Sequence, residues 1–247
     1  MIRYSKKFYF FKVYENWFQY KFRIADLFSL NTYLHLKDIE NKKVVGIKHH
    51  TATVELKLDQ DAETIFSKFS STIRNEVRKS EKEGVVCSFS GDVETFVKFY
   101  NDFASAINIS LTSKRRVEEM KEHFVITFAY SGNELLAAHS YLADAEVGIA
   151  RLYHSASKRF DENFDRNMIG RANKLLMYKD MLYFKEKGFK IYDFGGIAEG
   201  TTDKRLAGIN EFKLSFGGEK VTCINYSSFG YEFLKKMGRK FGATGNG

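Results

Sequence analysis

The stretch from residue 166 to residue 218 most constrains how this chain can fold. From Leu175 to Phe184 apolar side chains fall on every side, which predicts a helix that the rest of the protein covers on most of its surface. Gly188 is suited to follow that helix, because glycine readily adopts the left-handed backbone found after helix ends. We therefore expect a helix, a short strand over residues 190–194 and a second short helix.

The first helix of this stretch begins with small and polar residues. Glycine and alanine at a helix start let a ligand approach the free N–H groups, where the helix dipole favours anions such as a pyrophosphate. The strand that follows ends in two glycines, and ligands bind at the carboxyl ends of strands in open α/β sheets. We expect a phosphate-bearing donor at the helix start, bound by Asn167, Gly170, Arg171, Ala172 and Asn173, with the alternative for Asn173 that it holds the splayed strands.

Upstream of this stretch, another helix is predicted over about residues 61–83, with a break at Ser70 and Ser71, either of which could cap a new segment. Apolar residues recur every four positions along it. This spacing places Arg74 and Arg78 one turn apart beside the buried stripe, where they can bind one phosphate or carboxylate together. The alternative is that both form salt bridges on a solvated face, with Glu76, Glu81 or Glu83.

Several strings of residues carry a resemblance to a known family. YDFGGI and GINEFKLSFGGE, preceded by IGRANKLL and KEKGF, resemble the Fem-type branch of the GNAT acyltransferase superfamily. That branch includes enzymes that add amino acids to bacterial peptidoglycan precursors, and related N-acyltransferases. The segment with Arg74 and Arg78 is similar to the family's arginine-bearing helix, so the resemblance covers about residues 50–226.

The order of elements predicted from residue 85 onward agrees with that resemblance. Periodicity indicates a strand, two helices, three strands, a helix, a strand, a helix and a strand. The resemblance implies an α/β (α+β) fold in which helices flank a GNAT-like mixed, mostly antiparallel sheet. We expect a partial Fem-type subdomain with a short extension at 1–84, the GNAT-like domain at 85–226, and a basic segment with a tail at 227–247.

Residues 1–47 are rich in aromatic and basic side chains. Alternating bulky residues predict either strands or an irregular layer on the main domain. The portion before residue 85 is too short for the second GNAT unit that Fem-type enzymes typically carry.

The resemblance implies transfer of an acyl group to an amine. Phe212 and Lys213 match the Phe-Lys pair that the Fem family is thought to use at the reacting carbonyl, so Lys213 is the candidate that stabilises charge there. Alternatively, Lys213 is one exposed lysine on a helix whose Ile209, Phe212 and Phe216 face the core. Asp193 is expected either to move the amine's proton and orient substrate or to fix the following loop. The substrate-binding candidates are Arg74, Arg78, Gly195, Gly196 and Phe212.

The expected donor is acyl-coenzyme A, because a single GNAT unit leaves little surface for a large donor and a large acceptor together. Aminoacyl-tRNA is the alternative donor, and the expected acceptor is an amine of a cell-envelope sugar, lipid or peptide precursor. A net charge of +8 also suits a non-catalytic module that holds a phosphate-rich polymer. We expect no metal, because Cys87 and Cys223 lack metal-ligand spacing and His49 and His50 would point to opposite faces of a strand.

No signal-peptide pattern and no run of about 20 apolar residues is visible, so a cytoplasmic protein is expected. Residues 231–241 form a basic amphipathic segment. It either rests on an anionic membrane, at the inner face, or covers a sheet edge as a surface helix.

Overall fold

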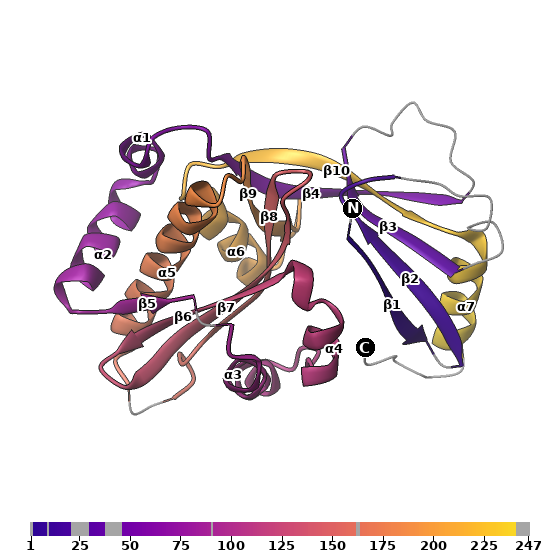
Figure 1. Ribbon diagram of the computed structural model, residues 1–247, viewed down its shortest axis with the longest axis horizontal. Helices are drawn as coiled ribbons and strands as arrows, with labels where there is room; N and C mark the ends of the chain where they lie inside the picture. The colour runs from indigo at the N-terminus through magenta and orange to yellow at the C-terminus, as the bar shows by residue number, and fades with distance from the viewer. Residues whose placement is uncertain are drawn as a thin grey trace. The chain divides into compact units, whose positions relative to one another are not determined.

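The computed structural model describes residues 2–8, 10–20, 30–37, 46–89, 91–161 and 164–240 (Figure 1). The chain forms two compact units. The terminal unit combines residues 1–53 with residues 221–247, and the central unit is formed by residues 54–220.

In the terminal unit, strand pairing joins the two ends of the chain. Strands β1 and β2 are antiparallel, β2 and β3 are parallel, and β3 is antiparallel to β10. Aromatic and aliphatic side chains form the core, and the Trp17 Nε1–H donates to the Tyr4 hydroxyl over 2.8 Å. Most of the described part of residues 1–47 therefore forms strands, which is one of the two expected outcomes, whereas residues 21–29 and 38–45 lie outside the described residues. The elements are β1 (Ile2–Phe8), β2 (Phe11–Trp17), β3 (Leu30–Leu36), β10 (Glu219–Ser227) and α7 (Phe229–Lys240).

The central unit is built on a mixed sheet with the strand order β4-β9-β8-β7-β6-β5. Strands β5 to β8 pair antiparallel with their neighbours, whereas β8 and β9 are parallel, so the predicted mixed and mostly antiparallel sheet is confirmed. Strand β4 enters this unit from the terminal unit. The strands are β4 (Ile47–Lys57), β5 (Val86–Ser88), β6 (Phe124–Ser131), β7 (Glu134–Asp144), β8 (Ile149–Ser157) and β9 (Ile191–Ile197).

The helices of the central unit begin at side-chain caps. An aspartate or serine precedes each α-helix and accepts backbone N–H groups of its first turn, which satisfies donors that have no partner within the helix. The expected break is confirmed, because Ser70 caps α2. The helices are α1 (Ala62–Ser67), α2 (Ser71–Lys82), α3 (Val93–Ala106), α4 (Lys114–Glu119), the 3-10 helix η2 (Lys121–His123), α5 (Arg166–Glu186) and α6 (Lys204–Leu214).

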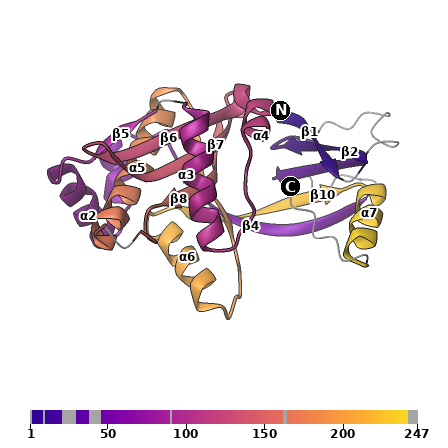
Figure 2. The ribbon, with the colours of Figure 1, turned by 90° about the horizontal axis from the view of Figure 1, so that it is seen from below.

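Helices cover both faces of the central sheet. Helices α2 and α5 lie on one face, where Leu176, Met181 and Phe184 are buried in the larger core (Figures 1 and 2). Helix α3 lies on the other face, where Phe96 and Tyr100 are buried in a second cluster. Across the described ranges, no helix is both long and apolar enough to span a bilayer.

One glycine offers a test of the packing between helices α1 and α6. Gly217 has a φ of +75°, and an added Cβ would lie 2.4 Å from the Lys68 carbonyl oxygen. Gly200 has a φ of +65° but open space around it. Gly200→Ala should cost about 1–2 kcal/mol of unfolding free energy through backbone strain alone, and Gly217→Ala a further 1–3 kcal/mol or so through the clash. Urea denaturation of both variants measures the difference, and equal losses would contradict the close packing.

Candidate active site

Strands β8 and β9 pair in parallel over three residues, and the last pair is Arg151 with Asp193. Both strands continue beyond this pair, to Ser157 and Ile197. Backbone groups that leave a ladder need other partners, which a bound ligand can supply. The end of the β8–β9 pairing is therefore the place in the sheet where a ligand can reach the backbone.

Asp193 holds the loop that follows the paired segment. Its carboxylate is buried, and it accepts hydrogen bonds from Arg151 Nη1 and from the Gly195 N–H, the latter over 2.7 Å. Gly195 has a φ of +82°, and an added Cβ would lie 3.2 Å from the Leu152 carbonyl oxygen. Only glycine meets both conditions without strain. These contacts agree with the loop-fixing alternative for Asp193, and its role in proton transfer stays a prediction.

Lys213 lies at the same loop. The half-buried ammonium group donates to the Gly196 carbonyl oxygen over 2.6 Å, and it would lie 3.6 Å from a Cβ placed on Gly195. Burial lowers the pKa of Lys213 to about 8, the positive charge of Arg151 acts in the same direction, and Asp193 opposes both. Lys213 is therefore directed at the Gly195–Gly196 loop and can lose its charge near neutral pH.

The side chains on helix α6 divide between the core and solvent. Phe212 is partly buried and packs edge-to-face on Phe216, with ring centroids 5.3 Å apart. Ile209, which the sequence places in the core, is 43% exposed. The expectation for Ile209 is wrong because α6 packs mainly through its last turn.

The Arg151–Asp193 pair lies on the face of the sheet that α3 covers. Ala150, Tyr192 and Phe194 belong to the core on the α5 side. Successive residues of a strand point to opposite faces, so Arg151 and Asp193 point to the α3 side. His154 lies on this side as well, packed on Phe96 and Tyr100 of α3, and burial lowers its pKa to about 4.

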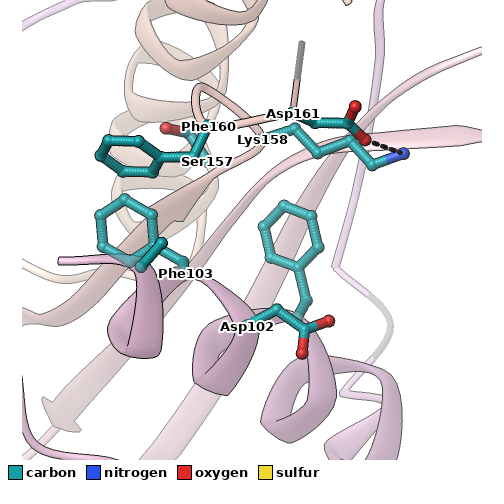
Figure 3. Close-up of a pocket in the computed structure, with 8 residues that line it drawn as sticks. Asp102, Phe103, Ser157, Lys158, Phe160 and Asp161 are labelled. Atoms are coloured by element: carbon teal, nitrogen blue, oxygen red, sulfur yellow. Dashed lines mark ion pairs between the residues drawn. The ribbon is translucent and has the colours of Figure 1, made fainter. Parts of the chain in front are cut away.

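A pocket of about 290 Å³ lies on the α3 side, between α3 and the end of β8. Figure 3 shows the Phe103 and Phe160 side chains next to each other and the ion pair between Lys158 and Asp161 apart from them. The Lys158 ammonium also bonds Glu134 over 2.8 Å, whereas Asp102 is exposed at the pocket wall. The pocket thus combines aromatic walls with carboxylates and a lysine that two acidic side chains already neutralise.

The donor-binding candidates on α5 separate into two groups. Asn167 is exposed and Gly170 is partly exposed, with only Lys174 Nζ near an added Cβ, at 3.8 Å. Ala172 and Asn173 are buried, and the Arg171 guanidinium forms two hydrogen bonds with the Glu83 carboxylate, over 2.7 and 2.8 Å. At the start of α5, a ligand can therefore reach Asn167 and Gly170 most directly.

Arg74 and Arg78 lie one turn apart on α2, as their spacing predicts. The Arg74 Nη1 donates to the carbonyl oxygens of Ser67 and Phe69, which end α1 and precede α2. The Arg78 guanidinium lies 5.2 Å from the centre of the Phe66 ring. In this structure Arg74 therefore joins α1 to α2, and binding of substrate by the two arginines stays a prediction.

Comparison with solved structures places this geometry in context. FemX matches with a TM-score of 0.63 and 11% identity, over 94% of this chain and 85% of that chain. The C-terminal domain of a putative lysylphosphatidylglycerol synthetase from Agrobacterium fabrum matches with a TM-score of 0.63 and 10% identity, over 95% and 84%. The chain has a Fem/GNAT-like fold. L-PGS from Bacillus licheniformis also matches, with a TM-score of 0.58 and 10% identity over 96% and 84%.

The sequence itself matches no protein-family profile and no curated protein. The resemblance carried by residues 50–226 nevertheless predicts the Fem/GNAT-like fold correctly, and the structural similarity extends over a larger part of the chain. At such low identity the comparisons establish the fold alone.

A buried polar network, missed by the sequence analysis, supports the Fem/GNAT-like fold beneath the site. The Asp180 carboxylate lies 2.7 Å from His139 Nδ1 and accepts a hydrogen bond of 2.5 Å from the Tyr141 hydroxyl. His139 Nε2 lies 3.0 Å from Asn173 Oδ1, and the Tyr192 hydroxyl lies 2.8 Å from that of Tyr141. Burial, with the Asp180 charge, raises the pKa of both tyrosines well above the usual value. The network thereby joins α5, β7 and β9 next to Asp193.

The signal for this network was weak. Asp180 is a charged residue in an otherwise apolar part of α5, and His139 and Tyr141 alternate on an apolar strand. Each alone fits a surface position or an isolated buried group. Only packing brings residues 41 positions apart into one cluster.

We expect the Asp180→Ala variant to lose about 3–5 kcal/mol of unfolding free energy, because the buried carboxylate shared by His139 Nδ1 and the Tyr141 hydroxyl would be removed from the interior. The neighbouring Lys179 forms a partly exposed ion pair with Glu81, and Lys179→Ala should cost about 0–1 kcal/mol. Chemical denaturation with both variants provides the comparison. Similar losses in the two variants would argue against a structural role for the network.

Proposed function

We propose that this chain is an N-acyltransferase that moves an acyl group from a thioester donor, acyl-coenzyme A, to an amine of a cell-envelope sugar, lipid or peptide precursor. One observation carries the proposal: the β8–β9 pairing ends after three residues, where the Lys213 ammonium meets the Gly195–Gly196 loop. The Fem/GNAT-like fold supports acyl or aminoacyl transfer as the reaction class.

In the proposed reaction the neutral amine attacks the thioester carbonyl and negative charge develops on the carbonyl oxygen. The C–S bond then breaks, and the departing thiolate takes up the proton that the amine loses as the amide forms. Protonated Lys213 stabilises that oxyanion, for which it exchanges its bond to the Gly196 carbonyl oxygen. The Arg151–Asp193 pair positions the loop through the bond from the Gly195 N–H. Transfer is direct, without a covalent enzyme intermediate.

The acyl donor and the amine acceptor have separate candidate positions. The exposed first turn of α5, near Asn167 and Gly170, is the candidate position for the pyrophosphate of the donor, which would have to replace the Asp165 carboxylate on the Asn167 N–H. The pocket beside α3 suits the acceptor, because Phe103 and Phe160 offer aromatic surfaces to an ammonium group and Asp102 offers a carboxylate. The acceptor amine then approaches from the face of the sheet to which Asp193 points.

Aminoacyl-tRNA is the second candidate donor. The observation in its favour is the similarity to FemX over 94% of this chain. The two donors differ in how they reach the protein, because only coenzyme A has to place a small pyrophosphate at the start of α5. A donor-binding measurement therefore separates them.

Calorimetric titration with acetyl-coenzyme A tests the donor site. We expect binding to the wild type and a loss of at least about tenfold in affinity for Gly170→Glu, whose carboxylate would repel the pyrophosphate at the helix start. Gly170→Ala is the matched control, since only Lys174 Nζ lies near its added Cβ, at 3.8 Å. Absence of binding at millimolar donor would reject acyl-coenzyme A and favour aminoacyl-tRNA.

The pH dependence of the transfer rate tests Lys213. Because its pKa is lowered to about 8, Lys213 loses its charge as pH rises through 8, whereas an arginine at this position keeps its charge. The ratio of the wild-type rate to the Lys213→Arg rate should be constant at low pH and fall about fivefold between pH 8 and pH 9. Release of the free coenzyme A thiol with a panel of primary amines measures both rates.

The ratio removes the ionisation of the acceptor amine, which affects both enzymes equally. A ratio that rises with pH would instead identify neutral Lys213 as the proton acceptor. A ratio that stays constant over this range would show that the charge of Lys213 does not affect the transfer step.

A further inference from the structure

The net positive charge of the chain comes from one of its two units. Residues 1–53 and 221–247 contain 14 lysines and arginines but five acidic residues. Residues 54–220, which contain the candidate active site, have 25 basic and 26 acidic residues. The terminal unit therefore accounts for the whole positive excess, and the central unit is close to neutral.

Helix α7 of this basic unit exposes a stripe of large apolar side chains. Phe229 is 60% exposed, Phe233 is 64% exposed and Met237 is 39% exposed. They are four residues apart, so the three side chains lie within about 80° around the helix axis. Lys236 is exposed on the same side of the helix. We call these four residues the α7 stripe.

Positions that flank the α7 stripe already have partners within the terminal unit. Glu232 is only 8% exposed, and its carboxylate lies 3.5 Å from His49 Nε2. An added Cβ on Gly230 would lie 3.0 Å from Leu30 of β3, and the Ser228 hydroxyl accepts from the Asn31 N–H at the start of the helix. Glu232 of α7 is thus buried while Phe229 and Phe233 are exposed, whereas a surface helix usually turns its apolar side chains toward the core.

We propose that the α7 stripe binds the surface of an anionic lipid bilayer. Aromatic and long apolar side chains insert at the boundary between headgroups and acyl chains, and basic residues nearby are attracted to anionic lipids. The terminal unit supplies this charge, and α7 is too short and polar to span the bilayer, so it lies in the plane of the interface. A second copy of the chain fits this surface less well, because two terminal units of the same positive charge repel each other.

A tryptophan reporter makes this binding directly visible. The chain has one tryptophan, Trp17, which is buried. Phe233→Trp therefore adds a single exposed indole at the centre of the α7 stripe. With vesicles of phosphatidylcholine that contain phosphatidylglycerol, the emission should shift to the blue and be quenched by brominated acyl chains. Vesicles of phosphatidylcholine alone should bind at least about tenfold more weakly, because several basic residues contribute.

Vesicle co-sedimentation of the full chain separates the contribution of the apolar side chains from that of the basic residues. Phe229→Ser with Phe233→Ser should weaken binding by at least about tenfold, and Lys236→Gln by about fivefold. Leu111→Ser is the control, because Leu111 is an equally exposed apolar residue of the central unit. All these positions are exposed, so the thermal unfolding transition should be unchanged.

Three results would overturn the proposal: equal binding to neutral and anionic vesicles, retention of binding by the serine double variant, or an equal loss in Leu111→Ser. Sedimentation velocity provides a fourth, since self-association abolished by Phe233→Ser without any vesicle binding would assign the stripe to a second copy of the chain. None of these measurements depends on acyltransfer, so the lipid proposal and the proposed function can fail separately.

Discussion

The candidate site depends on where the parallel pairing of β8 and β9 ends. Arg151 and Asp193 form the last pair, and their ion pair lies at the point where the ladder stops. Asp193 also binds the Gly195 N–H, so the same carboxylate ends the pairing and shapes the loop beneath Lys213. A buried carboxylate needs such partners, because its desolvation is otherwise too costly. The ion pair and the loop therefore have to form together.

The two faces of the sheet differ around this point. On the α5 side, the buried network of Asp180, His139 and Tyr141 joins helix α5 to strand β7, and Tyr192 extends it to β9. On the α3 side, Asp193 points toward the face that carries the pocket of Phe103 and Phe160. One side thus joins the strands to α5 through buried hydrogen bonds, and the other carries the pocket that we propose for the acceptor. This asymmetry is what the proposed acyl transfer requires of a scaffold.

The two units differ in net charge as well as in fold. The central unit, which contains Lys213, Arg151 and Asp193, is close to neutral. The terminal unit concentrates the basic residues and presents the α7 stripe. In our proposals, chemistry belongs to one unit and attachment to a lipid surface to the other. An acceptor in the cell envelope would suit both.

From residue 85 onward the sequence by itself determined the elements and their order, because apolar periodicity, capping serines and aspartates, and glycines act over a few residues, whereas it left residues 1–47 open between strands and an irregular layer. It also singled out Asp193 beside the Gly195–Gly196 loop and Lys213 on the following helix, but only the tertiary structure brings Lys213 to that loop. Only the tertiary structure decided which polar groups of α5 face inward. Arg171 binds Glu83, 88 positions away, and Asn173 meets His139, so neither is free as local pattern suggested. Such partners depend on how helices and strands pack, which local periodicity does not encode.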